Sequence, residues 1–443
     1  MRLEMLERPR WQMLIMTLMM LGLIACGAQP AADPDEPAGA EGRGEEAAGA
    51  PVVLDLWIFE GEEAFLPRLE EEFEAQNENI DLQITEIPES EYAVKVDTAL
   101  AANEPPDIGF VLEPRWVKAG QMVDLTGMME AEGIALEDYN TAALGYECLP
   151  DDGETGVYCL GSYTGAVVLF YNKDLFDAAG VPFPSPTEPM TIAEYKEIAC
   201  DLTQASENLE EQVWGGVAEA MIWWTDPRYA FSEDGRTVQV TNPDVVQAYQ
   251  DLADMVSEGC APSYSDYDLV GDVDMMTQGM QATGILDNIY GVELFEEAGM
   301  NYGVAPVPVV NEGDPVWVSS WTDRFGVFSQ SDDVEAAQQF ITFLATDGNR
   351  LRAEVGGIPL ITEMADEMDW AADNEGRQEL LQTIELARPP VFVPNWWGVV
   401  DPIWDAFDLM LEGEMTAEEA LAEASTYMEE NLEQAWETWE SVE

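Results

Sequence analysis

The sequence predicts an α/β protein of two lobes, and three observations carry this prediction. Near the start of the folded part, strand-like and helix-like stretches alternate, an order typical of a parallel, doubly wound sheet. Residues 167–171 are apolar and rich in β-branched and aromatic types, which predicts a strand buried on both faces; Asn172 can then cap a short helix that Gly180 ends. Finally, 443 residues exceed one ordinary core, so two domains or lobes are expected.

The first elements are expected to be a strand, a helix, a strand, a helix and a strand, over residues 52–59, 62–76, 80–87, 92–102 and 108–111. The first helix is acidic and amphipathic, with its apolar residues on one face. Ligands of open α/β sheets bind beyond the carboxyl ends of the strands, where this sequence carries Glu60 and Glu113. Further helices are expected over residues 192–202 and 242–258.

The charge balance is strongly acidic. Lys plus Arg number 17 against 89 for Asp plus Glu, a net charge of −72, and this field repels nucleic acid and anionic lipid. A Lys-poor acidic surface indicates adaptation to high salt, where self-repulsion is screened, with an alkaline habitat as the alternative. The composition, 47% hydrophobic and 10% aromatic, can fill a core and argues against disorder.

Histidine is absent from the chain. Its absence removes the Ser-His-Asp triad, the Cys-His pair and every His-ligated metal site. We expect no catalytic residues, no metal and no cofactor.

The N-terminus has the features of an exported lipoprotein. Basic residues precede an apolar run over residues 13–24, too short to span a bilayer, and Leu23-Ile24-Ala25-Cys26 resembles a bacterial lipobox. We expect residues 1–25 to be a signal peptide and Cys26 to be the lipidated N-terminus, anchored by more than one acyl chain. Residues 26–50 are rich in Ala, Gly, Pro and acidic residues, which predicts a disordered acidic tether.

Four cysteines remain in the exported part, and four allow three pairings. A turn-rich connection between Cys148 and Cys159 could bring these two together, which would leave Cys200 with Cys260. A zinc site is a poor alternative because no C-x-x-C spacing is present.

Five segments of the chain stand in a telling order. They are Tyr-Asn-Lys-Asp-Leu at residues 171–175, a Gly-x-x-Ala helix and strand at 275–287, Tyr-Gly-Val-x-Pro-x-Pro at 302–308, residues 321–359, and Pro-Asn-Trp-Trp at 394–397 with the helices after it. Their order resembles that of the family 1 extracellular solute-binding proteins of ABC importers, the maltose-binding-protein type. None is specific alone, but together they extend from Val52 to the C-terminus.

The resemblance implies a type II periplasmic-binding-protein-like fold, in which two discontinuous α/β lobes are joined by a hinge with the ligand cleft between them. It places the N-terminal lobe at residues 51–163 and 309–358, and the C-terminal lobe at residues 168–304 and 364–443. The chain would cross between the lobes three times, near residues 164–167, 305–308 and 358–362.

The resemblance also places candidate ligand-binding residues on both sides of the cleft. Sugars are bound by aromatic rings, carboxylates, amides and Arg, and these types recur there. On the first lobe they are Glu60, Glu113, Arg115, Tyr163, Trp321 and Asp323. On the second lobe they are Trp223, Trp224, Asp287, Asn288, Tyr290, Trp396 and Trp397.

The resulting hypothesis is a monomeric lipoprotein on the outer face of the cell membrane or in the periplasm. It would bind a carbohydrate, an oligosaccharide above all, and deliver it to the transmembrane subunits of an ABC permease. The chain carries no ATPase P-loop, so partner subunits would supply the energy.

Three alternatives stay open. Excess carboxylate would suit a polyamine or another cationic solute. A glycoside hydrolase also combines an aromatic cleft with two carboxylates roughly 5 to 10 Å apart. An adhesion or scaffold lipoprotein would have neither a small-molecule ligand nor a hinge motion.

Overall fold

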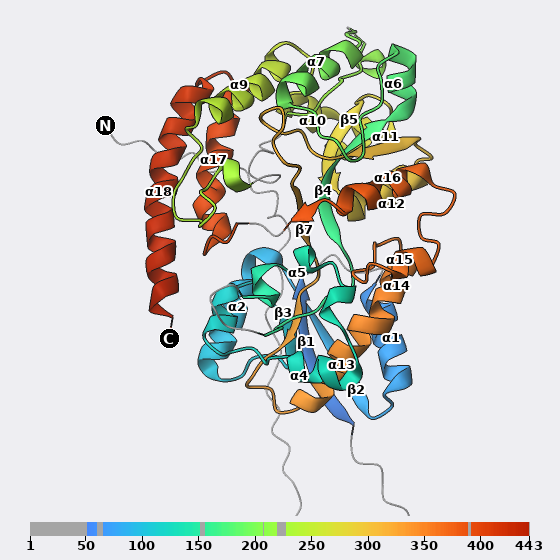
Figure 1. Cartoon of the computed structure of the whole chain (residues 1–443), viewed down its shortest axis with the longest axis vertical. Coiled ribbons are helices and arrows are strands. Elements are labelled where there is room, and N and C mark those ends of the chain that lie inside the picture. Colours follow the sequence, from blue (N-terminus) through green and yellow to red (C-terminus); the bar gives the residue numbers. More distant parts are fainter. Residues whose placement is uncertain are drawn as a thin grey trace, which may run out of the picture. The chain divides into compact units, whose positions relative to one another are not determined.

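The computed structural model describes residues 51–59, 65–150, 156–206, 208–218, 227–388 and 391–442, except for the side chains of residues 210, 268, 272–274, 289 and 290 (Figure 1). The expected signal peptide, Cys26 and the tether lie outside these ranges. Among the described residues, no helix combines the length and apolarity needed to cross a membrane.

The first sheet has the strand order β2-β1-β3-β8, over Ile80–Ile87, Val52–Phe59, Ile108–Phe110 and Phe325–Val327. Strand β1 pairs in parallel with β2 and β3, whereas β8 is antiparallel to β3. The three strands predicted at the start of the folded part are therefore confirmed. The last strand of the sheet comes from much later in the sequence, which makes this lobe discontinuous.

Helices pack around this sheet. They are α1 (Leu66–Gln76), α2 (Glu89–Ala102), α3 (Pro114–Lys118), α4 (Thr126–Glu132), η1 (Leu136–Asp138), α5 (Thr141–Cys148), α13 (Val334–Phe343), η4 (Leu344–Gly348) and α14 (Asn349–Glu354). The buried face of α1 is the predicted apolar one. Helix α2 begins three residues before the predicted start, because Pro88 precedes it and Glu89 and Glu91 occupy its first turn, where carboxylates favour a helix.

The second sheet is organised around β4 (Gly165–Asn172), all of whose residues are buried, as predicted. It has the order β5-β4-β7-β9, over Thr283–Asp287, Gly165–Asn172, Val318–Trp321 and Ala387–Arg388, with β6 (Tyr302–Ala305) also paired to β4. Because Leu169 pairs with Ile285 of β5 and Ala305 of β6, these strands lie on opposite edges of β4. The pairs of β4 are all antiparallel, unlike those of β1.

Asn172 ends β4 and caps α6 (Lys173–Ala179), as predicted. Its side chain accepts hydrogen bonds from the amides of Asp174 and Leu175 at 3.0 and 3.2 Å. Gly180 follows with φ of 69°, a conformation that glycine adopts without strain.

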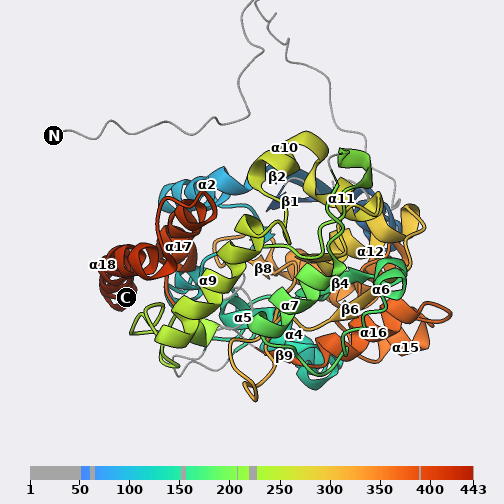
Figure 2. The ribbon, with the colours of Figure 1, turned by 90° about the horizontal axis from the view of Figure 1, so that it is seen from above.

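The other described helices of this lobe are α7 (Ile192–Leu202), η2 (Leu209–Glu211), η3 (Pro227–Tyr229), α9 (Pro243–Ser257), α10 (Tyr264–Val270), α11 (Asp272–Thr277), α12 (Asn288–Glu297), α15 (Met364–Glu367), α16 (Glu375–Ile384), α17 (Trp396–Leu411) and α18 (Ala417–Ser441). Helices α9, α17 and α18 share one apolar core with α7. In the views of Figures 1 and 2, α17 and α18 run side by side.

Strand β7 lies between the two sheets in chain order. It pairs with β4 through Gly165–Trp321 and Ala166–Ser320, so residues 318–321 belong to the second sheet. The chain then enters the first sheet at β8, after residues 322–324. The lobe bounds and the three expected crossings stay a prediction, and this pairing favours a crossing at residues 322–324 over one at residues 305–308.

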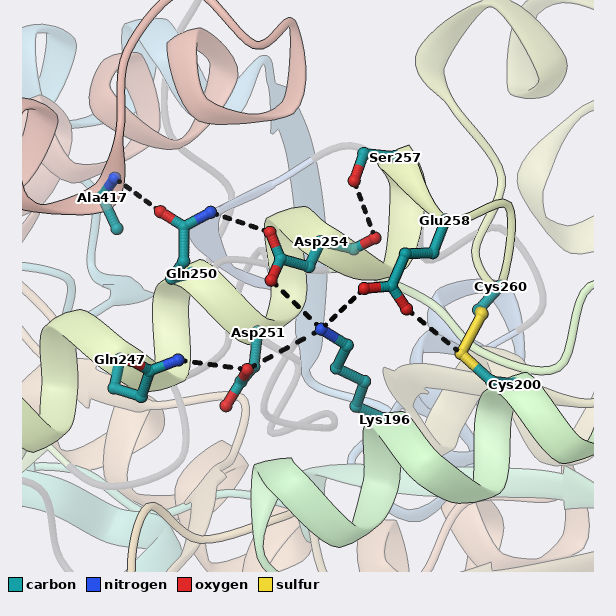
Figure 3. A network of polar contacts seen from close by, with 10 residues as sticks. All are labelled: Lys196, Cys200, Gln247, Gln250, Asp251, Asp254, Ser257, Glu258, Cys260 and Ala417. Atoms are coloured by element: carbon teal, nitrogen blue, oxygen red, sulfur yellow. Dashed lines mark hydrogen bonds and ion pairs between the residues drawn. A yellow bond between two sulfur atoms is a disulfide. The ribbon is translucent and has the colours of Figure 1, made fainter.

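Each lobe contains one disulfide. Cys148 is bonded to Cys159 in the first lobe, and Cys200 is bonded to Cys260 in the second. The second disulfide joins α7 to the end of α9, and Lys196 joins the same two helices (Figure 3). Lys196 Nζ lies 3.1 Å from carboxylate oxygens of both Asp254 and Glu258, and 3.8 Å from Asp251. One cation thus lies among three carboxylates of α9 and its end, and offsets part of their negative charge.

Candidate ligand-binding cleft

A cavity of about 630 Å³ lies between the two sheets. On one side it is lined by the carboxyl ends of β1 and β3, at Phe59 and Phe110, and by the loop and helix that follow β3. On the other side it is lined by Asp287 at the end of β5, by residues 319–321 of β7 and by residues 391–393 and 395–397. The volume falls within the range of roughly 300–1,000 Å³ usual for ligand sites. Below, this cavity is called the cleft.

Seven of the residues predicted from the sequence line the cleft: Glu113, Tyr163, Asp287, Trp321, Asp323, Trp396 and Trp397. Glu60, Trp223 and Trp224 lie outside the described residues, as does the side chain of Tyr290.

Two predicted residues, Arg115 and Asn288, form hydrogen bonds with other groups of the protein. Arg115 donates two hydrogen bonds to Asp97, at 2.9 and 2.8 Å, and lines a neighbouring cavity instead of the cleft. Asn288 is buried; it accepts from the amide of Ala166 at 2.5 Å and donates to the Thr164 carbonyl at 3.2 Å. Asn288 therefore holds the chain where it enters β4 and is not among the described residues that line the cleft, while its role as a ligand contact stays a prediction.

The second-lobe wall of the cleft is aromatic. Trp396 packs against Phe231 with ring centroids 5.4 Å apart, whereas the next residue, Trp397, is 51% exposed. Trp321 lies against Gly165, where a side chain would place its Cβ 2.6 Å from the indole nitrogen. A glycine at that position therefore makes room for the Trp321 ring beside the cleft.

The first-lobe wall is charged. Glu147 forms an ion pair with Arg324, and the Arg324 guanidinium lies 5.4 Å from the centre of the Phe110 ring. Arg324 Nε is buried and has no hydrogen-bond partner within the described part of the chain. Since a buried donor without a partner costs free energy, a ligand oxygen in the cleft is a suitable acceptor for it.

Asp323 joins its own segment of the chain to the segment at Ser162, which precedes β4. It accepts hydrogen bonds from the Ser162 amide at 2.6 Å and from the Ser162 hydroxyl at 2.5 Å, and pairs with Arg352 at 3.3 Å. The Arg352 guanidinium stacks 4.8 Å from the Tyr163 ring centre. Asp323 is 2% exposed. Its buried bonds hold the chain at Ser162 and, through Arg352, position the Tyr163 ring.

The pKa of the Glu113 carboxyl group departs from its ordinary value. Burial raises its pKa above the ordinary value, while the nearby Arg115 guanidinium, 3.4 Å away, acts in the opposite direction. The raised pKa means that the protonated form is favoured more in the folded protein than in the unfolded chain.

Several cleft residues were missed by the sequence analysis: Phe59, Phe110, Tyr146, Glu147, Arg324, Phe392 and Asn395. Phe59 and Phe110 end β1 and β3, so the rule that ligands bind beyond strand ends could have identified them. Asn395 lies in the Pro-Asn-Trp-Trp motif, which could have identified it. No sequence signal marks the others, because folding brings them to the cleft from α5, the residue before β8 and the segment before α17.

One cluster has the composition of a metal site but not the chemistry. Ligand atoms of Cys200, Glu258 and Cys260 lie within 4.8 Å of one another. The two sulfurs are joined in a disulfide, so neither is a thiolate that could bind a metal ion.

The fold and the cleft define a type II periplasmic-binding-protein-like protein, with two discontinuous α/β lobes and a ligand site between them. Residues 60–350 match the family model of the bacterial extracellular solute-binding proteins. The chain belongs to this family.

Among relatives, the maltodextrin-binding protein of Bacillus subtilis (strain 168) is 20% identical over 455 residues, which cover 97% of this chain and 99% of the relative. A putative binding protein of Brucella abortus (strain 2308) is 24% identical over 377 residues, covering 82% of this chain and 88% of the relative. The sn-glycerol-3-phosphate-binding periplasmic protein of Rhizobium meliloti (strain 1021) is 23% identical over 276 residues, covering 58% of this chain and 64% of the relative.

Solved structures share the fold. An ABC substrate-binding protein of Listeria monocytogenes in complex with cycloalternan superposes with a TM-score of 0.73 at 23% identity, covering 86% of this chain and 99% of that one. A sugar-binding protein of Xanthomonas citri gives a TM-score of 0.71 at 18% identity, covering 88% of this chain and all (100%) of that one.

Proposed function

We propose that this chain is the extracytoplasmic solute-binding lipoprotein of an ABC importer, and that it captures an oligosaccharide and delivers it to the membrane permease. The observation that carries the proposal is the cleft, in which an aromatic wall with Trp321, Trp396 and Trp397 faces a charged wall. Pyranose rings offer apolar CH faces for stacking and hydroxyls for hydrogen bonds, so each wall has a partner on the same ligand.

The charges of the cleft argue for a neutral ligand over an anionic one. Its described lining contains the carboxylates of Glu89, Glu113, Glu147, Asp287 and Asp323, whereas Arg324 is the basic residue of that lining. Since Arg324 already pairs with Glu147, a phosphate ester such as the ligand named for the Rhizobium relative would meet net repulsion.

The relatives support the carbohydrate class. The Bacillus relative is named for maltodextrin, and a Streptococcus pneumoniae relative, 21% identical over 438 residues, is named as a maltooligosaccharide ABC transporter solute-binding lipoprotein. Anchoring through Cys26 and a monomeric state belong to the same proposal.

The test is thermal unfolding of the protein in molar salt against mono- and oligosaccharides, with polyamines and glycerol-3-phosphate as controls. A ligand at a hundredfold its dissociation constant adds about 2.7 kcal/mol to the free energy of unfolding, which raises the midpoint by several degrees. A shift with one sugar class, and recovery of that sugar unchanged, supports the proposal. A shift with polyamines alone, or release of hydrolysed sugar, would refute it.

A further inference from the structure

A second cavity of about 310 Å³ lies beside the cleft, and the last turns of α18 form one of its walls. Below it is called the side cavity. It is lined by Trp436 and Trp439 of α18, and it shares Pro114, Tyr146 and Phe392 with the cleft. The same three side chains border both cavities, and the rings of Tyr146 and Phe392 pack against each other with centroids 5.2 Å apart. A ligand in the cleft therefore has to displace one of these two rings to enter the side cavity.

Both lobes contribute to the side cavity. Lys118 and Tyr146 come from α3 and α5, which pack around the first sheet, whereas Arg236, Trp436 and Trp439 come from the part of the chain that packs with the second. An occupant would therefore contact both lobes, as an occupant of the cleft does, and would add to the stability of the arrangement in which they meet.

The aromatic walls are fixed in place by contacts within the protein. Trp436 Nε1 donates a hydrogen bond to the Gly235 carbonyl at 2.9 Å, and the Arg236 guanidinium lies 3.8 Å from the centre of the Trp436 ring. Phe392 contacts Trp436 and Trp439 at ring-centroid distances of 5.7 and 4.9 Å with its plane turned 82° and 62° from theirs. Rings held in this way lose little freedom when a ligand binds.

Polar groups accompany these rings. Lys118 Nζ donates to the Trp439 carbonyl at 2.7 Å and lies 4.5 Å from its ring centre, and Glu233 and Asp234 add carboxylates. Lys118 and Arg236 each cover one face of a tryptophan ring. The ring surface that they leave uncovered, with donors and acceptors beside it, suits the apolar and polar groups of a sugar ring. The side cavity thus repeats the chemistry of the cleft in about half the volume.

We infer that the side cavity is an accessory subsite that holds a sugar unit of a chain whose main part lies in the cleft. The inference rests on the proposed function and narrows its substrate to oligosaccharides long enough to reach from the cleft past Tyr146 and Phe392. Affinity should therefore rise with chain length, and the rise should depend on α18.

The experiment is titration calorimetry of the intact protein with linear maltooligosaccharides from maltose to maltoheptaose, and with a mannooligosaccharide series, in molar salt. Trp439→Ala removes a ring but keeps the carbonyl that Lys118 binds. We expect it to weaken binding of the longest ligand about fivefold to tenfold and to leave the shortest within about twofold.

Two further variants keep the test independent of folding. Glu233→Trp adds bulk at the exposed rim and removes no ring, so it should cause the same length-dependent loss. Tyr427→Ala is the matched control, because Tyr427 is an aromatic residue of α18 that is 53% exposed and lines neither cavity. It should bind every ligand as the unchanged protein does.

The outcomes separate the two proposals. If no carbohydrate binds, the proposed function itself fails. If carbohydrates bind with affinities that do not depend on length, or if Trp439→Ala weakens short and long ligands equally, the accessory subsite is refuted while the proposed function stands.

Discussion

The two lobes differ in the topology of their sheets, in their disulfides and in the side chains that line the cleft. The first lobe has a largely parallel sheet, a disulfide between residues 11 apart and a charged wall at the cleft. The second has antiparallel strands around β4, a disulfide between residues 60 apart and an aromatic wall. Because the three tryptophans of the cleft and Arg324 lie on different walls, a ligand that contacts both would favour the arrangement in which the lobes meet.

The disulfides give the largest expected difference between the lobes. In the chain-entropy model, closing a 60-residue loop contributes about 4 kcal/mol and closing an 11-residue loop about 3 kcal/mol. Replacing Cys200 and Cys260 by Ser should therefore lower the free energy of unfolding by more than replacing Cys148 and Cys159. Denaturant unfolding of both double variants measures this, and a larger loss from the shorter loop would contradict it.

Lys196 gives the next effect. Burial by itself would lower the pKa of Lys196, but hydrogen bonds to Asp254 and Glu258 outweigh burial and raise it. The charged Lys196 therefore stabilises the folded protein fully at neutral pH, and this contribution is lost only above pH 10.5. Lys196→Met leaves three neighbouring carboxylates without their cation and should cost about 1–2 kcal/mol at low salt.

Salt distinguishes this effect from lost packing. At about 1 M salt the Debye length is roughly 3 Å, so the cost of Lys196→Met should shrink. Lys95→Met is the control, since Lys95 forms an exposed pair with Glu91 at 3.0 Å and should change stability by less than about 0.5 kcal/mol. A loss for Lys196→Met that is the same at low and high salt would show that charge is not its cause.

The aromatic wall is tested by Trp397→Ala. Trp397 is 51% exposed at the cleft, so its removal should spare the core and weaken oligosaccharide binding about tenfold, or 1.4 kcal/mol. Phe183→Ala removes another exposed ring, one that does not line the cleft, and should leave affinity unchanged. Titration calorimetry measures the affinity of both variants. If Trp397→Ala binds the oligosaccharide as tightly as Phe183→Ala, the aromatic wall is not part of the ligand site.

Glu113 gives the smallest effect, and its sign follows from the direction of the shift. Because burial raises its pKa, the folded protein binds the proton more tightly than the unfolded chain, so stability falls as pH rises from the ordinary carboxyl range through the raised pKa. Because Gln cannot titrate, Glu113→Gln should lack this pH-dependent contribution to the free energy of unfolding. Melting curves across that range should show the unchanged protein losing stability relative to Glu113→Gln as pH rises; the opposite trend would contradict the assignment.

Local patterns predicted the elements of the fold well. The apolar run that became β4, the cap at Asn172 and the end at Gly180 depend on neighbouring residues alone, and all are confirmed. Strand pairing is harder to predict. Trp321 is expected in the first lobe, yet β7 pairs with the start of β4, beyond the residues of β4 that pair with β6. Such pairing joins residues far apart in the chain, which no short segment encodes.

The site was predictable in kind and less so in detail. The tryptophans at positions 321, 396 and 397 line the cleft, as an aromatic ligand site requires. Asn288 and Asp323 have the same chemistry as ligand-binding residues, yet their partners are backbone groups and Ser162 near the crossings. Whether an amide or carboxylate serves a ligand or the chain itself depends on distances that only the folded structure provides.

The scarcity of lysine has a practical consequence. Of the four lysines, Lys118 lies against Trp439, Lys173 is 4% exposed and Lys196 is 18% exposed, whereas the side chain of Lys95 is 46% exposed. Among the lysines, an amine-reactive fluorophore should therefore couple first at Lys95, once the α-amino group is blocked. Lys95 lies about two turns along α2 from Glu89, which lines the cleft, so a dye at this position would convert the native sequence into an optical reporter of ligand capture.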